Sequence, residues 1–365
     1  MFYETKKYFG RSGITIGCPK CGGRSKKNGH FRGRQRYLCL SCRCCFVKQK
    51  HLSVSFKDFS DFYRLVIGDV NRHQLTKDKH ICRWTLSVRF KVFFNKPLYY
   101  DEVWKVLPPK LVNPWVYGVD GKWLKRQGVF ILHRNITTKE NLYCSFHLGE
   151  TYSALSSDSL RLTELIGGKR SYPVGVISDW KGAIVSSVGS CFGDIPHQRC
   201  LTHVTRTLKI LLPKKSPFLS TVLLRNIALK LIHLQSQEEI EVWFKSLASW
   251  HDRYGHRLKE RTINQDKTSK HKWWYTHSKL RRAWRLLTKN PEPFFKHLSH
   301  ELLPHSNNSL EGTISQAVNK LINHRGMKLH QQISFLRWYF TFSRVKNKQD
   351  LKKLWAYWKS VNNSV

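Results

Sequence analysis

Three acidic residues stand in contexts that suit metal ligation, in a chain that is otherwise strongly basic. Asp120 and Asp179 each follow an apolar, strand-like run, and Glu311 opens a helix-like run after Asn-Asn-Ser-Leu. A protein that binds a polyanion has an electrostatic reason to avoid carboxylates near it, unless those carboxylates hold metal ions. We therefore treat the three as candidate catalytic residues and as candidate ligands of Mg²⁺ or Mn²⁺.

The segments that carry the two aspartates alternate between strand and helix patterns. The predicted elements are strands over 115–120, 128–136, 141–148, 172–178 and 195–199, and helices over 152–166, over 181–191 and from 202. A β-β-β-α-β-α-β-α order predicts an α/β fold, an RNase H-like mixed sheet with flanking helices. The first and fourth strands of such a sheet lie side by side, so Asp120 and Asp179 are expected to face one point.

The third carboxylate has few candidates, because the only glutamates after residue 261 are Glu292, Glu301 and Glu311. Glu292 lies between two prolines, where a regular helix is disfavoured, and Glu301 lies in a His-rich, loop-like stretch. Glu311 begins an apolar run at helical spacing, after possible caps at 307–309. The alternative is that the aspartates only end strands at turns and that Glu311 is a charge favoured by a helix dipole.

Two Cys-x2-Cys pairs near the N-terminus predict a metal-binding ribbon. Cys18 and Cys21 are separated by seventeen residues from Cys39 and Cys42, a layout typical of a four-thiolate Zn²⁺ site. Residues 1–50 also carry thirteen Lys or Arg and a single acid, so this zinc ribbon is expected to contact phosphates. A purely structural ribbon is the alternative, and Cys44 and Cys45 leave the fourth ligand open.

Charge defines the class of partner. The 365 residues include 64 Lys or Arg and 24 Asp or Glu, a formal net charge of +40, which indicates a nucleic-acid partner. A ribosome-associated or membrane-surface protein without chemistry is the alternative. No apolar run is long enough to span a bilayer and no signal peptide is evident, so a cytoplasmic, nucleoid-associated location with reduced cysteines is expected.

A helical region is expected over 51–110. Apolar residues recur at helical spacing on either side of a break at Arg72-His73-Gln74, with basic residues between them, a pattern that favours either a helix-turn-helix unit that contacts DNA or a packing bundle. Pro108, Pro109 and Pro114 indicate a boundary before the next domain.

Four motifs together resemble a known family. They are Gly-Val-Asp-Gly, Ile-Ser-Asp-Trp-Lys-Gly-Ala, His-Gln-Arg-Cys-Leu-Thr-His-Val-Thr-Arg at 197–206, and Asn-Asn-Ser-Leu-Glu-Gly with His-Arg-Gly-Met at 324–327. Over roughly 110–345 the chain is similar to bacterial insertion-sequence transposases of the Mutator-like type. The resemblance implies a DDE catalytic domain over 111–345 in which Asp120, Asp179 and Glu311 hold the catalytic metals.

The same resemblance assigns accessory residues and segments. Cys200 and His203 match a Cys-x2-His signature, for which packing and DNA positioning are favoured over half of a zinc site. Arg325 is expected to contact a phosphate or to cap a helix. Residues 205–300 match a helical insertion, in which Trp273, Trp274, Tyr275 and Trp284 either stack on bases or are buried, and 346–365 is expected to be a basic tail.

The expected function is metal-dependent cleavage and strand transfer at the ends of an insertion sequence. The implied partners are double-stranded DNA, as terminal inverted repeats and as target, and further copies of the chain, with no membrane. Two alternatives remain: an RNase H-like nuclease that cuts without joining, and a transposase-derived regulator that binds DNA through the ribbon without catalysis.

Overall fold

The computed structural model describes residues 16–47, 54–68, 70–266, 268–324 and 326–363. The chain separates into two compact units, residues 1–55 and 56–365. Within the described residues, no helix has both the length and the apolar character needed to cross a membrane.

The first unit is a small antiparallel sheet. Its strands are β1 (Ser25–Phe31), β2 (Arg34–Cys39) and β3 (Cys45–Val47), in the order β1-β2-β3. Arg32 and Gly33, which join β1 to β2, both have positive φ, as the tightest hairpin turns require. Among the described residues of this unit, the buried hydrophobic side chains are Cys18 and Cys39, and the Tyr37 and Phe46 rings stack, so the cysteines are its main potential source of stability there.

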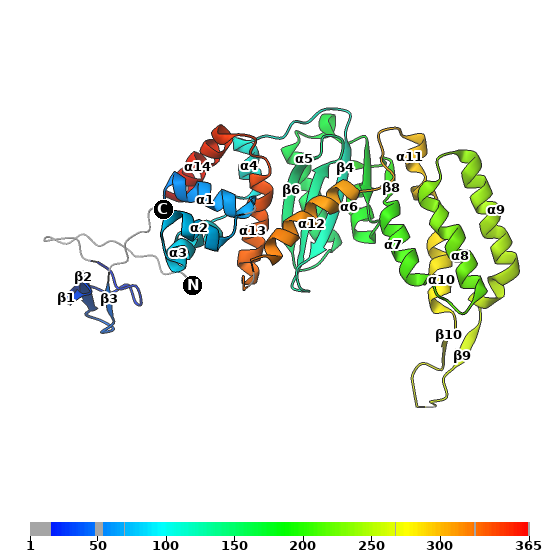
Figure 1. Cartoon of the computed structure of the whole chain (residues 1–365), viewed down its shortest axis with the longest axis horizontal. Coiled ribbons are helices and arrows are strands. Elements are labelled where there is room, and N and C mark those ends of the chain that lie inside the picture. Colours follow the sequence, from blue (N-terminus) through cyan, green and yellow to red (C-terminus); the bar gives the residue numbers. More distant parts are fainter. Residues whose placement is uncertain (1–15, 48–53, 69, 267, 325, 364–365) are drawn as a thin grey trace. The chain divides into compact units, whose positions relative to one another are not determined.

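The second unit is built on a mixed five-stranded sheet, which confirms the predicted mixed α/β class (Figure 1). Its strands are β4 (Val116–Trp123), β5 (Val129–Asn135), β6 (Glu140–His147), β7 (Gly175–Ser178) and β8 (His197–Arg199). They lie in the order β6-β5-β4-β7-β8. The β4-β5-β6 meander is antiparallel, whereas β7 and β8 run parallel to β4. The first and fourth strands of the sheet are therefore neighbours.

Helices cover both faces of this sheet. Tyr117 and Val119 face a core made with α5 (Tyr152–Leu165) and α6 (Gly182–Phe192). Gly118 and Asp120 alternate to the other face, where α12 (Asn308–Ile322) contacts β4 and β5. On β5, the Phe130 ring stacks on Phe340 of α13 (Leu329–Phe342) with centroids 5.5 Å apart.

The helices before the sheet pack with the end of the chain. They are α1 (Phe56–Val66), α2 (Arg72–Lys79), α3 (Arg83–Asn95) and α4 (Tyr100–Val106). Phe59 of α1 contacts Trp338 of α13 and both Trp355 and Trp358 of α14 (Lys348–Asn363). Residues 56–110 therefore do not form a core separate from the rest of the second unit.

Two local predictions need correction. The expected break at 72–74 is the first turn of α2, because the Asn71 side chain accepts a hydrogen bond from the Gln74 N–H and caps the helix. The expected basic tail over 346–365 is instead helix α14, because its buried apolar residues recur at helical spacing. They are Leu351, Leu354 and Trp358.

A helical insertion follows β8 and has a core of its own. Its main helices are α7 (Leu201–Leu211), α8 (Leu219–Lys230), α9 (Gln237–Tyr254) and α10 (Ser278–Thr288), with a two-stranded ribbon of β9 (Arg261–Ile263) and β10 (Trp273–Tyr275) and a short helix α11 (Lys296–Ser299). Trp284 stacks on the buried Trp250, as packing aromatics do. Trp273 and Trp274, in contrast, lie exposed on the ribbon.

The packing of α14 generates the first prediction. Leu354 is fully buried, whereas the neighbouring Lys352 is exposed. Leu354→Ala should lower the free energy of unfolding by about 2–5 kcal/mol, and Lys352→Ala by less than about 0.5 kcal/mol. Urea unfolding followed by tryptophan fluorescence checks this, because all thirteen tryptophans belong to the second unit. Equal effects of the two substitutions would mean that α14 does not pack as described.

Candidate functional site

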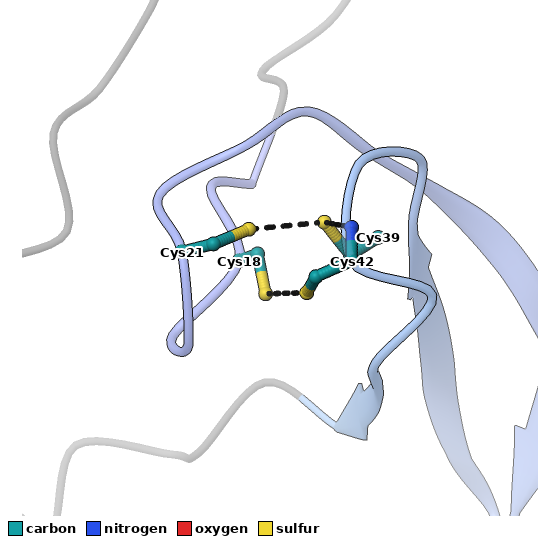
Figure 2. A group of neighbouring side chains, drawn as sticks. All are labelled: Cys18, Cys21, Cys39 and Cys42. Carbon is teal, nitrogen blue, oxygen red and sulfur yellow. Dashed lines mark hydrogen bonds between the residues drawn. The ribbon is translucent and has the colours of Figure 1, made fainter.

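Four cysteine side chains of the first unit converge on one point (Figure 2). The Sγ atoms of Cys18 and Cys42 lie 3.6 Å apart, and those of Cys21 and Cys39 lie 3.5 Å apart. All four sulfurs lie within 4.8 Å of one another. A tetrahedral ion with Zn–S bonds of about 2.3 Å needs sulfurs roughly 3.8 Å apart, so this cluster could bind zinc.

Backbone donors support the thiolate form of this cluster. The Lys20 N–H donates a hydrogen bond to the Cys18 Sγ, and the Cys42 N–H donates one to the Cys39 Sγ. The bond from the Cys42 N–H lowers the pKa of Cys39 to about 6. Among the described cysteines, Cys44 and Cys45 lie outside the four-sulfur group, so the fourth position falls to Cys42, as the spacing indicated.

In the second unit, Asp120 lies on β4 and Asp179 directly follows the neighbouring strand β7. Gly118 of β4 pairs with Ile177 of β7, and these two strands are parallel. Asp120 and Asp179 each lie two residues further along the chain from this pair, in the same direction. Asp120 is 8% exposed. Burial raises the pKa of Asp120 to about 6, with His203 lowering it and the charges of Asp179 and Glu311 adding to the rise. The three predicted carboxylates therefore interact electrostatically.

Asp179 is held in a tight turn after β7. The Ser178 Oγ is hydrogen-bonded to His197 on β8 and accepts a bond from the Trp180 N–H. Trp180 has φ of 67°, a conformation that costs a bulky residue energy, and its ring contacts that of His197. The Lys181 Nζ lies 2.9 Å from Asp179 and 2.6 Å from Glu150. A lysine thus links two carboxylates beside Asp120.

Glu311 lies in the first turn of α12 and faces α7. One of its oxygens lies 2.8 Å from Arg206, and the other lies 3.1 Å from His203 Nδ1. The contact with His203 is short enough for an ion pair but lacks the geometry of a hydrogen bond. Glu311 Oε1 and His203 Nδ1 are therefore both buried without a hydrogen-bond partner. Buried unpaired polar atoms are costly, and they favour a site that a ligand completes.

Cys200 connects the helix that carries His203 to the helix that carries Glu311. Its buried Sγ accepts a hydrogen bond from the Asn307 N–H, immediately before α12, and the Leu201 N–H donates to the His305 carbonyl. Cys200 also packs with Val116 and Ile177, from β4 and β7. These contacts favour the packing role expected for Cys200.

The described residues contain a second group of potential metal ligands, made of Cys200, His203 and Glu311, whose donor atoms lie within 4.8 Å of one another. Asp120 and Asp179 belong to neither group of the described residues. A sulfur, nitrogen and oxygen donor set suits zinc, whereas carboxylates alone suit Mg²⁺ or Mn²⁺. Glu311 belongs both to the group with Cys200 and His203 and to the predicted set of three carboxylates. Arg325 lies outside the described residues.

The glycines around Asp120 allow close approach of other segments. A Cβ at Gly118 would lie 2.4 Å from the Ile136 side chain and 3.3 Å from Asn307, and a Cβ at Gly121 would lie 2.8 Å from Glu150 Oε1. Any larger residue would push away Ile136 at one position and the Glu150 carboxylate at the other. The Gly-Val-Asp-Gly motif therefore serves the assembly of the site.

Three polar residues of this site were missed by the sequence reasoning: Glu150, Lys181 and Arg206. Glu150 could have been found from the sequence, because it comes shortly after β6. Since β5 is antiparallel to both β4 and β6, those two strands run in the same direction and end at the same edge of the sheet. Lys181 and Arg206 lie within two of the motifs quoted above, Ile-Ser-Asp-Trp-Lys-Gly-Ala and the stretch 197–206, but the sequence reasoning gave neither a role, because basic residues are common in this chain.

A basic cavity of about 490 Å³ lies beside the Asp179 turn. Trp180 contributes to its wall, and Arg199 of β8 contributes a guanidinium whose Nε has no hydrogen-bond partner. The other cations are Arg282 and Arg285 of α10, and Lys289, which directly follows that helix. This cavity offers four positive charges next to a carboxylate.

Compared with known proteins, the chain matches no family model and no curated sequence.

The cysteine cluster predicts one bound zinc ion per chain. Cys39→Ser should remove most of the zinc, because the cluster loses a ligand, whereas Cys45→Ser, at an exposed residue outside the cluster, should retain it. Metal analysis of the purified proteins checks this. Tryptophan fluorescence should be unchanged in both, since unit 1 contains no tryptophan. Equal zinc content in the two variants would contradict the assignment.

The raised pKa of Asp120 predicts a stability change that depends on pH. Because the folded state favours the neutral acid, the stability of the protein falls as pH rises from about 4 through about 6. Asp120→Asn keeps the hydrogen bond accepted from the Gly121 N–H without the charge. At pH 7.5 it should raise the free energy of unfolding by up to about 3 kcal/mol, and at pH 4 by almost nothing.

Urea unfolding at the two pH values tests this effect. The control is Asp252→Asn on α9, which makes the same change of charge at an exposed position. It should shift the unfolding free energy by less than about 0.5 kcal/mol at either pH. A destabilised Asp120→Asn variant at pH 7.5 would contradict the electrostatic cost assigned to Asp120.

Proposed function

We propose that this chain is a transposase of the DDE type, which binds double-stranded DNA and catalyses metal-dependent phosphodiester cleavage and strand transfer. The observation that carries the proposal is the placement of Asp120 on β4, of Asp179 directly after the neighbouring strand β7, and of Glu311 on α12, which contacts β4, in a chain of net charge +40. A cavity lined by four cations lies beside the Asp179 turn. Buried acids next to a basic surface suit a metal-dependent reaction on a polyanion.

We propose further that the sheet is RNase H-like. The supporting feature is its order, an antiparallel meander of β4, β5 and β6 followed by β7 and β8 parallel to β4, with Asp120 on β4 and Asp179 directly after its neighbour β7. The position of Glu311 on a helix that contacts β4 is a further support. Fold alone does not decide function, so the proposal depends on the site.

The donor atoms fit a divalent cation. Asp120, Asp179 and Glu311 offer carboxylate oxygens, and Glu311 Oε1 is buried without a hydrogen bond, with the His203 ring nitrogen at ion-pair distance. Lys181 and Arg206 offset two of these negative charges. When bound, divalent ions activate water and stabilise charge at the reacting phosphate. Our assignment gives the three carboxylates the role of holding such ions.

The chain's own cations would position the DNA. Arg199, Arg282, Arg285 and Lys289 can neutralise phosphates on one side of Asp179, and the half-buried Trp180 in the cavity wall offers a surface for a base. Because phosphoryl transfer depends mainly on positioning and charge neutralisation, such a cavity serves the reaction without any covalent intermediate on the protein.

DNA outside the cleavage site would contact other basic elements. In α3, Arg83, Trp84 and Lys91 are exposed, and α2 precedes α3 after a turn in which His80 has positive φ. This arrangement supports a helix-turn-helix contact, with the ribbon as a second contact. Joining two DNA ends requires more than one catalytic subunit in such a mechanism, so we propose assembly of several copies on DNA.

Metal-dependent cleavage and strand transfer on DNA that carries the element's ends tests the proposal. Asp120→Asn, Asp179→Asn and Glu311→Gln should each reduce both reactions about a hundredfold or more while DNA binding is retained, because each removes a metal ligand rather than a DNA contact. Asp252→Asn serves as the matched control and should behave like the parent.

Three other outcomes would redirect the assignment. Cleavage without strand-transfer products would favour an RNase H-like nuclease, and DNA binding without any reaction in the parent would favour a non-catalytic regulator. Full activity in one of the three variants would exclude that carboxylate, and Glu150→Gln then becomes the first replacement to test, because Lys181 links Glu150 to Asp179.

A further inference from the structure

A second polar cavity lies on the α12–α13 side of the sheet, apart from the carboxylates. It has a volume of about 580 Å³ and is lined by residues of β5, β6, α12, α13 and the start of α14. Asp120, Asp179 and Glu311 do not contribute to it. Cavities of roughly 300–1,000 Å³ are the size that holds small molecules, so this one is large enough for a nucleotide.

The charge that lines this cavity is strongly positive. Two acids, Glu140 and Asp350, contribute to its wall, and both are engaged: Glu140 with the Lys110 N–H and with Lys346, and Asp350 with the Lys346 N–H. Against these two acids stand six cations, which leaves a net charge of +4 on the wall. The six are Lys110, Arg134, Lys139, Arg344, Lys346 and Lys353.

Arg134 is the most informative of these cations. It is 7% exposed on β5, and one of its terminal nitrogens donates to Thr313 Oγ1 of α12. No ion pair of the described residues includes Arg134, and its Nε has no hydrogen-bond partner. Burial lowers the pKa of Arg134. A buried guanidinium without an acid is costly, and a bound anion would remove that cost.

Two further groups beside Arg134 lack partners. Thr138 Oγ1 and Asn141 Oδ1 are both buried without a hydrogen bond, and both residues line the same cavity. A hydroxyl can donate to a phosphate oxygen, and an amide oxygen can accept from a sugar hydroxyl or a base. Apolar wall is supplied by Val106, Pro108 and Tyr339, against which a sugar or a base can pack.

We propose that this cavity binds the phosphate group of a nucleotide, with Arg134 as the central ligand. A guanidinium is well suited to phosphate because its donors match two phosphate oxygens at once. The nucleotide has two possible sources, a unit of a DNA strand or a free mononucleotide. The proposal does not depend on the proposed cleavage reaction, because no metal ligand lines the cavity.

Binding to the zinc-loaded full-length protein tests the proposal. The probes are inorganic phosphate, dTMP and a 20-base-pair duplex, each titrated at constant ionic strength, with tryptophan fluorescence during thermal unfolding as a second readout. Arg134→Gln should raise the Kd of the responding probe at least about tenfold, because a charge-assisted contact is lost. Without the probe this variant should melt no lower than the parent, since a buried, unpaired charge is removed.

A matched pair of lysines keeps the test decisive if Arg134→Gln misfolds. Lys353 lines the cavity, whereas Lys352, its exposed neighbour on α14, does not. Lys353→Gln should weaken binding of the same probe severalfold, and Lys352→Gln should leave it unchanged.

The outcome also identifies the source of the phosphate. If dTMP binds more tightly than inorganic phosphate and the variants leave duplex binding unchanged, the ligand is a free nucleotide. If the variants weaken duplex binding and dTMP binds no better than inorganic phosphate, the ligand is a phosphate of DNA. Identical binding of all three probes by the parent, Arg134→Gln and Lys353→Gln would overturn the proposal. DNA cleavage plays no part in any of these readouts.

Discussion

Repulsion between buried carboxylates is the constraint on which the central site depends. The β4–β7 pairing brings Asp120 of β4 near Asp179, which directly follows β7, and Glu311 approaches from α12, so like charges are concentrated in a poorly solvated place. The cations Lys181 and Arg206 offset this charge, and His203 lies at ion-pair distance from Glu311. A site that carries this cost without a use would be unusual, and divalent cations are the ligands that most directly relieve it.

The rest of the second unit holds these groups in place. The cores behind the sheet and around Phe59 fix the strands and α13, while Cys200 and the backbone at His305 connect α7 to α12. The helical insertion has its own core and contributes Arg282, Arg285 and Lys289 to the cavity beside Trp180. The first unit instead concentrates its potential for stability in four cysteines, which suits a small sheet with few apolar residues.

Much of the sheet could be predicted from sequence, because its strands are apolar runs bounded by turn residues. Asp179 does follow a strand end, but the strand expected to end at Asp120 continues to Trp123. The four-cysteine cluster could be predicted because its spacing is restrictive. The break expected at 72–74 was wrong because local capping by Asn71 outweighs a run of polar residues. The tail expected over 346–365 was wrong because basic composition hid the apolar spacing of Leu351, Leu354 and Trp358. Glu150 and Arg134 were missed because their importance comes from tertiary neighbours and from burial, which sequence spacing does not encode.

The most direct test of the central account is the position of a bound divalent ion. Crystals of the protein equilibrated with Mn²⁺, measured at a wavelength where manganese scatters anomalously, would locate it. The account predicts anomalous density in contact with carboxylate oxygens of Asp120, Asp179 and Glu311. Density that contacts Cys200, His203 and Glu311 but neither aspartate, or no density near these residues at saturating Mn²⁺, would contradict it.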